Sequence, residues 1–165
     1  MGCSERLVKQ RQRSRGFSLP ELLLAAALLG ILAAIALPSG QAALARMRVE
    51  AASRSLMLAI ERQRDRALRQ GRSVVLHLGG GDGLLEQTAA AHGGVEVHHN
   101  LPGALRFSAN GLLIDGGTVV VTSPATPLRR CLVWSLPLGV LRLGQYGADP
   151  AAGPSSGHCQ ADPIL

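Results

Sequence analysis

The strongest constraint on this chain is an apolar run close to its N-terminus. Residues 22–37 are 16 consecutive apolar or small residues, and a basic segment containing Arg11, Arg13 and Arg15 precedes them. As a helix at ~1.5 Å per residue, this run would be about 24 Å long, and residues 17–37 would reach about 31 Å. That length crosses the hydrocarbon core of a bilayer, so we expect a membrane-spanning helix over residues 17–38.

Glu21 is an acid placed beside this run. An ionised carboxylate is costly to hold in lipid unless it is paired or close to the interface, so Glu21 is a candidate functional residue. The alternative interpretation is that Glu21 only marks the membrane boundary and reaches the headgroups.

Five residues around the run stand at fixed offsets, namely Gly16, Phe17, Glu21, Gly30 and Pro38. This arrangement resembles the class III signal of type IV pilins and type II secretion pseudopilins. The resemblance implies that a prepilin peptidase, which is also the N-methyltransferase, cleaves between Gly16 and Phe17 and methylates Phe17. It implies that Glu21 faces the N-terminal amine of a neighbouring subunit, and that the helix loosens near Gly30 and Pro38. The partners implied are the inner membrane and other pilins or pseudopilins.

The distribution of charge indicates orientation more than nucleic-acid binding. The formal net charge is +6, but residues 1–16, the leader that the resemblance predicts, hold +4 of it as five basic residues less Glu5. Positive charge ahead of a membrane segment stays in the cytoplasm, so we expect a cytoplasmic N-terminus and a periplasmic head after Pro38. A cleaved secretory signal peptide is the rival interpretation, although the run exceeds a usual h-region and no clear small-x-small site stands out.

Residues 39–72 are predicted to form an amphipathic helix. Six residues fall within about 40° of one line at 100° per residue and should face the core: Val49, Ala52, Leu56, Ile60, Gln63 and Ala67. Arginines 54, 62, 69 and 72 lie opposite, on a face suited to water, a partner subunit or an anion. Gly71 is expected to end the helix in the left-handed conformation.

Residues 73–165 are predicted to form a β-rich globular head with a C-terminal tail. β-like runs occupy residues 73–78, 95–99, 118–122, 131–135 and 139–143, and weaker ones residues 84–88 and 105–107. The glycine-rich segment 79–83 is interpreted as a hairpin connection, because it lacks the lysine and the following helix of a phosphate-binding loop. We therefore expect an α+β, pilin-like fold in which a long N-terminal helix packs against an antiparallel sheet.

The order of these elements, with LPGALRFSANG at residues 101–111 and RRCLVWS at residues 129–135, is similar to the GspH/FimT group of minor pilins and pseudopilins. Some members of the FimT branch bind DNA through a Gly-Arg-x-Arg motif near the C-terminal strand. The corresponding residues 139–142 read GVLR, so the first arginine is absent. Arg142 remains the candidate DNA contact, joined by Arg129 and Arg130 if their strands lie side by side. A solvated surface is the alternative, because residues 73–165 hold four arginines against six acids and few aromatics.

The cysteines and histidines of the chain do not form a recognisable catalytic or metal site. Cys131 and Cys159 would face the oxidising periplasm and are expected to form a disulfide that ties residues 147–157 to the sheet, with two free buried thiols as the alternative. Cys3 lies in the leader. The five histidines show no ligand spacing, and the sequence contains no catalytic constellation or cofactor fingerprint, so we expect no metal, no cofactor and no enzyme.

The sequence thus predicts a minor type IV pilin-like subunit of four parts: a leader (1–16), a membrane helix and filament core segment (17–38), an amphipathic periplasmic helix (39–72) and a β-rich head (73–165). It would be processed in the inner membrane and take part in pilus assembly or initiation. Three alternatives remain: a GspH-type pseudopilin of a type II secretion system, a DNA-binding minor pilin for natural transformation, and an unrelated single-pass periplasmic protein.

Overall fold

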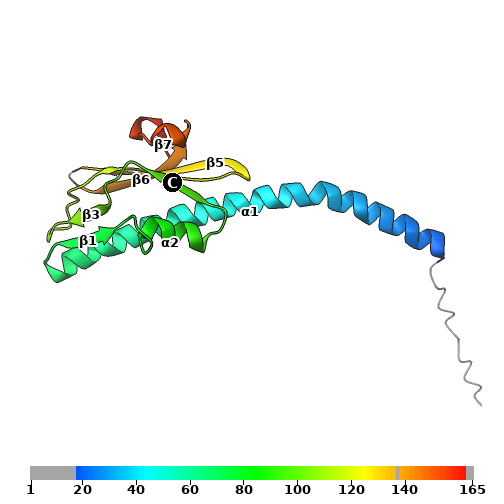
Figure 1. Ribbon diagram of the computed structural model, residues 1–165, viewed down its shortest axis with the longest axis horizontal. Helices are drawn as coiled ribbons and strands as arrows, with labels where there is room; N and C mark the ends of the chain where they lie inside the picture. The colour runs from blue at the N-terminus through cyan, green and yellow to red at the C-terminus, as the bar shows by residue number, and fades with distance from the viewer. Residues whose placement is uncertain (1–17, 137, 163–165) are drawn as a thin grey trace, which may run out of the picture. The chain divides into compact units, whose positions relative to one another are not determined.

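The computed structural model describes residues 18–136 and 138–162, and for residues 35–39 the backbone alone (Figure 1). The first element is helix α1, Leu19–Gln70. Its first turn is closed by the carbonyl of Ser18, which accepts the amides of Glu21 and Leu22 at 3.0 and 3.1 Å. Pro20 fits this turn because its missing amide would have no partner inside the helix. Gly71 follows the helix with a φ of 60°, as predicted for its C-terminal stop.

The chain forms two compact units, one ending at Pro38 and the other beginning at Ser39. In the first unit every described side chain of residues 18–34 is exposed, including those of eight leucines and isoleucines. We expected a membrane-crossing helix over residues 17–38; in the part of the chain that the structure describes, no helix is both long and apolar enough to cross a membrane.

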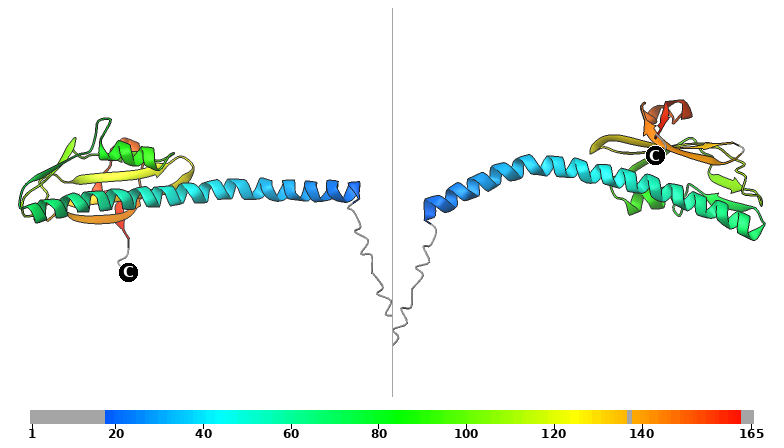
Figure 2. Two further views of the ribbon diagram at one scale, coloured as in Figure 1. Left: turned by 90° about the horizontal axis from the view of Figure 1, so that it is seen from below. Right: turned by 180° about the vertical axis from the view of Figure 1, so that it is seen from behind.

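The second unit is an α+β head, which confirms the predicted fold class. Its strands are β1 (Val74–His77), β2 (Glu96–His99), β3 (Ala104–Phe107), β4 (Gly117–Ser123), β5 (Thr126–Ser135), β6 (Val140–Tyr146) and β7 (Cys159–Ala161). They form a two-stranded sheet, β1-β3, and a five-stranded sheet in the order β2-β4-β5-β6-β7, with antiparallel pairing throughout. The strands lie along the C-terminal half of α1 (Figure 2).

The main core lies between α1 and the five-stranded sheet. Five of the six residues predicted to face it, Val49, Ala52, Leu56, Ile60 and Ala67, are at most 2% exposed, and only Gln63 is partly exposed. They pack in one cluster with Phe107, Val119, Val121, Leu132 and Trp134. The helical periodicity in the sequence therefore identified the buried face of α1.

The segment after β1 differs from the prediction. Residues 84–88 were expected to be a weak strand behind a hairpin connection, but they begin helix α2, Leu84–Ala91. Thr88, the residue that most favours a strand, donates its hydroxyl to the carbonyl of Leu84 at 2.8 Å, and Leu85 and Thr88 are buried. Strand β1 pairs with β3, so the glycine-rich loop leads from a strand into a helix; it still lacks the lysine of a phosphate-binding loop.

A second, smaller cluster lies on the face of the sheet opposite α1. It contains Val120, Cys131 and Tyr146, and Ala148 and Cys159 pack against it. The C-terminal tail lies on this face with two short 3-10 helices, η1 (Pro150–Ala152) and η2 (Ser156–His158). It then enters the sheet as β7, an edge strand that the sequence did not predict. The amide of Ser155 donates to the Tyr146 hydroxyl at 3.1 Å.

Candidate functional site

The N-terminal signal residues are the first group of candidates. Gly16 and Phe17 lie outside the described residues, so their cleavage and methylation remain predictions. Glu21 is exposed in the first turn of α1. The free amides of a helix N-terminus favour a negative charge, which makes this a favourable position for the Glu21 carboxylate.

Gly30 and Pro38 both lie inside α1. Within the described part of the chain, a Cβ atom built at Gly30 would have no heavy atom within 4 Å, apart from the backbone of its own helix and its chain neighbours. No contact among the described residues therefore requires glycine there. A residue without a side chain at this position instead suits close approach by another helix.

Cys131 and Cys159 are joined by a disulfide, with their Cα atoms 5.9 Å apart. Cys131 is fully buried on β5, and Cys159 is the first residue of β7. Tyr146 of β6 pairs directly with Cys159, so the disulfide spans one intervening strand and fixes the tail to the centre of the sheet.

The three candidate DNA-binding arginines do not form one basic patch. Their strands β5 and β6 are neighbours, as the hypothesis required, and Arg142 pairs with Val133. Successive side chains of a strand point to opposite faces, so Arg142 and Arg129 share the face covered by the tail while Arg130 faces α1. Arg129 donates a hydrogen bond to the carbonyl of Ala148, which leaves Arg142 as the exposed cation of the three. It lines an open hollow of about 520 Å³ beside the tail.

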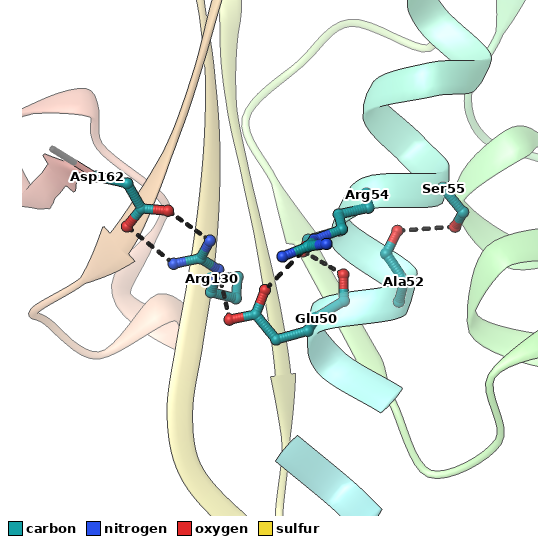
Figure 3. A network of polar contacts seen from close by, with 7 residues as sticks. Glu50, Ala52, Arg54, Ser55, Arg130 and Asp162 are labelled. Carbon is teal, nitrogen blue, oxygen red and sulfur yellow. Dashed lines mark hydrogen bonds and ion pairs between the residues drawn. The ribbon is translucent and has the colours of Figure 1, made fainter. Parts of the chain in front are cut away.

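Arg130 is a buried structural cation that the sequence analysis did not recognise. It is 5% exposed and donates two hydrogen bonds to the carboxylate of Asp162, at 3.0 and 2.6 Å. Its Nε also lies 3.3 Å from Glu50 Oε1, near enough for an ion pair although not aligned as a hydrogen bond. Figure 3 shows Glu50 of α1 between Arg130 and Arg54. Nothing local in the sequence relates these positions, because they lie far apart along the chain.

A second ion pair stabilises the region around β3. Arg106 donates two hydrogen bonds to Asp115, at 2.8 and 2.9 Å. These hydrogen bonds lower the pKa of Asp115 below its usual range and raise that of Arg106. Because Arg106 is 56% exposed, solvent screens the pair.

Comparison with known proteins gives one match. Residues 11–37 match the family model described as the prokaryotic N-terminal methylation motif. The chain therefore carries a prepilin-like N-terminal signal, and the matched segment contains Gly16, Phe17, Glu21 and Gly30 and ends one residue before Pro38. No curated protein and no solved structure matches the chain.

Proposed function

We propose that this protein is a minor pilin-like subunit of the FimT/GspH type, which takes part in the assembly or initiation of a type IV pilus. The methylation motif over residues 11–37 is the observation that carries the proposal. The fold supports it, because a long helix followed by an antiparallel sheet is consistent with a pilin-like subunit. In this proposal the work of the protein is binding and assembly, without catalysis.

The same signal supports a route through the inner membrane. Before assembly the apolar segment would anchor the chain with its N-terminus in the cytoplasm and its head in the periplasm. The exposed apolar side chains of residues 18–34 need an apolar partner, either lipid or the helices of other subunits. The disulfide is consistent with an oxidising compartment.

A GspH-type pseudopilin of a type II secretion system is the second candidate, because the methylation motif supports either kind of filament. We do not propose DNA capture by the arginines of the sheet. Arg130 is buried between two carboxylates and Arg129 is held by the tail, so a single exposed arginine, Arg142, remains of the three.

Mass spectrometry of the intact protein tests the proposal directly. After co-expression with a prepilin peptidase, we expect loss of residues 1–16 and a mature N-terminus heavier by one methyl group. A Gly16→Leu variant is the control and should keep its leader. A wild-type protein that keeps residues 1–16 under these conditions would overturn the proposal.

A further inference from the structure

Helix α1 carries a second row of residues along the head, opposite its buried face. The row follows spacings of three and four residues: Leu44, Met47, Ala51, Arg54, Leu58, Arg62, Asp65 and Arg69. At 100° per residue these eight positions fall within about 80° of arc, the width of a helix-packing stripe. All eight are exposed.

The two halves of this exposed row differ in chemistry. Its N-terminal half is apolar, with Leu44 54% and Met47 66% exposed. Its C-terminal half is basic, with Leu58, 49% exposed, between Arg54 and Arg62. The side chains of Arg54 and Arg69 are 72% and 81% exposed, and their nearest carboxylates, on Glu50 and Asp65, lie 3.9 and 3.8 Å away. Such loose, solvated pairs leave the guanidinium groups available to a partner.

We propose that the exposed row of α1 is a docking face for a helix of another pilin-like subunit, one that is apolar opposite Leu44 and Met47 and acidic opposite Arg54, Arg62 and Arg69. This partner chemistry rests on the proposed function, which makes other subunits the natural neighbours of the chain. A helix fits because the row is straight and follows the spacing that ridges-into-grooves packing requires. Over its 25 residue steps the row is about 37 Å long.

A second copy of this chain does not fit the same face. Two copies packed in parallel would place Arg54, Arg62 and Arg69 against their own equivalents, and like charges held together are strongly unfavourable. Two antiparallel copies aligned along the row would set Arg69 against Leu44 and Arg62 against Ala51, which desolvates these guanidinium groups without a partner. The row therefore selects a different, acidic subunit.

Nucleic acid is also a poorer fit than an acidic helix. A phosphate backbone is contacted by cations and polar groups, whereas this row contains three large exposed apolar side chains and Asp65. Mixed charge with apolar anchors is typical of a protein interface.

The proposal is tested with the processed full-length chain in detergent and a synthetic helical peptide of about 26 residues, the length of the row. The peptide carries leucine and alanine facing the apolar half and glutamate facing the three arginines. We expect fluorescence anisotropy to show binding about tenfold tighter than for a peptide of the same composition with leucine and glutamate alternating along the row. A duplex DNA of about 20 base pairs is the third probe, sized to cover the basic half of the row.

Charge reversal identifies the residues involved. An Arg62→Glu, Arg69→Glu double variant should weaken peptide binding about tenfold, and a peptide with lysine in place of glutamate should restore it. The matched control, Arg48→Glu with Arg142→Glu, changes the net charge equally at two arginines outside the row and should bind as wild type.

Three results overturn the proposal: equal binding of the ordered and alternating peptides, equal loss in the control variant, or preferential binding of the DNA duplex that the row variant abolishes. A chain that keeps its leader refutes the proposed function instead, so the two failures are distinguishable.

Discussion

Arg130 and Asp162 are joined by two hydrogen bonds, at 3.0 and 2.6 Å, although strand β6 separates β5 from β7 in the sheet. Asp162 immediately follows β7, and its carboxylate reaches the guanidinium on the face of the sheet that α1 covers. Glu50 approaches the same guanidinium from the helix. One buried side chain thus links the helix, the sheet and the C-terminal tail.

Replacing Arg130 should strongly destabilise the head. An Arg130→Met variant keeps much of the volume but removes the cation from Asp162 and leaves Glu50 only its loose pair with Arg54 at 3.9 Å. Because Glu50 and Asp162 keep 30% and 39% side-chain exposure, we expect a loss of about 2 to 3 kcal/mol, below the range for a fully buried pair. The sole tryptophan, Trp134, is 4% exposed and should report unfolding by denaturant through its fluorescence.

Arg142→Met is the matched control, since it removes an exposed arginine from the neighbouring strand. We expect its free energy of unfolding to stay within about 0.5 kcal/mol of wild type. Equal stability of the two variants would show that the Glu50–Arg130–Asp162 network contributes little.

The disulfide should stabilise the head independently of that network. Cys131 and Cys159 are separated by 28 positions, for which the loop-entropy model gives about 3 to 4 kcal/mol. A Cys131→Ser, Cys159→Ser double variant should unfold at correspondingly lower denaturant, and a reducing agent should shift the wild type toward it. Cys3→Ser alters only the leader and should leave the processed protein unchanged. Identical wild-type curves with and without reductant would contradict the prediction.

The stabilisation that the Arg106–Asp115 pair gives to the head should be lost at low pH. The hydrogen bonds from Arg106 lower the pKa of Asp115 below its ordinary 3.8. The stabilisation is therefore fully present above that value and is lost as the pH falls through the lower, folded-state pKa. In unfolding experiments from about pH 5 to about pH 2, Asp115→Asn should lack this component of the pH dependence, whereas Asp82→Asn should retain it. High salt should reduce the difference in stability between wild type and Asp115→Asn because Arg106 is exposed to solvent. Parallel pH profiles for these two proteins would refute the prediction.

The features predictable from the sequence are those set by local periodicity or chemistry. The buried row of α1 follows from helical spacing, and Gly71 ends the helix because glycine adopts positive φ without strain. The onset of β5 was placed five residues too late, at Cys131, because Pro127 and two arginines interrupt the β-like pattern. These arginines are accommodated by contacts from the tail, which no local pattern predicts.

The prediction of a basic patch formed by Arg129, Arg130 and Arg142 was wrong, again because it depended on non-local structure. Strand β5 contains both Arg129 and Arg130. Adjacent side chains of a strand point to opposite faces, so these two arginines cannot belong to one basic surface. The partners Glu50 and Asp162 lie at large sequence separations and required the three-dimensional structure. The exposed apolar members of the second α1 row were missed because only its arginines were considered.

Substitutions in the turn that precedes α2 test whether residues 84–91 form a helix, where the sequence predicted a strand over residues 84–88. A Cβ atom added at Gly83 would collide with the carbonyl oxygen of Leu78, which accepts the amide of Leu85 at 3.1 Å. Gly83→Ala should therefore cost about 1 to 3 kcal/mol of stability, because backbone must move. Gly81→Ala, in the same loop, has open space around its added Cβ and should be neutral or slightly stabilising. Equal effects of the two substitutions would argue against this packing of the loop on α2.

Substitution of Gly30 should have opposite effects on the stability of the single helix and on its incorporation into a filament. Since an added Cβ meets no described atom outside its own helix, Gly30→Ala should stabilise the isolated helix by up to about 1 kcal/mol, and circular dichroism should show equal or higher helicity. Under the proposed function the same change should lower incorporation into filaments, because neighbouring helices approach most closely where a side chain is lacking. Immunoblotting of sheared filaments measures this incorporation, with Ala33→Gly as a control that loosens the helix without adding bulk. Normal incorporation of Gly30→Ala would mean that no helix packs closely at this position.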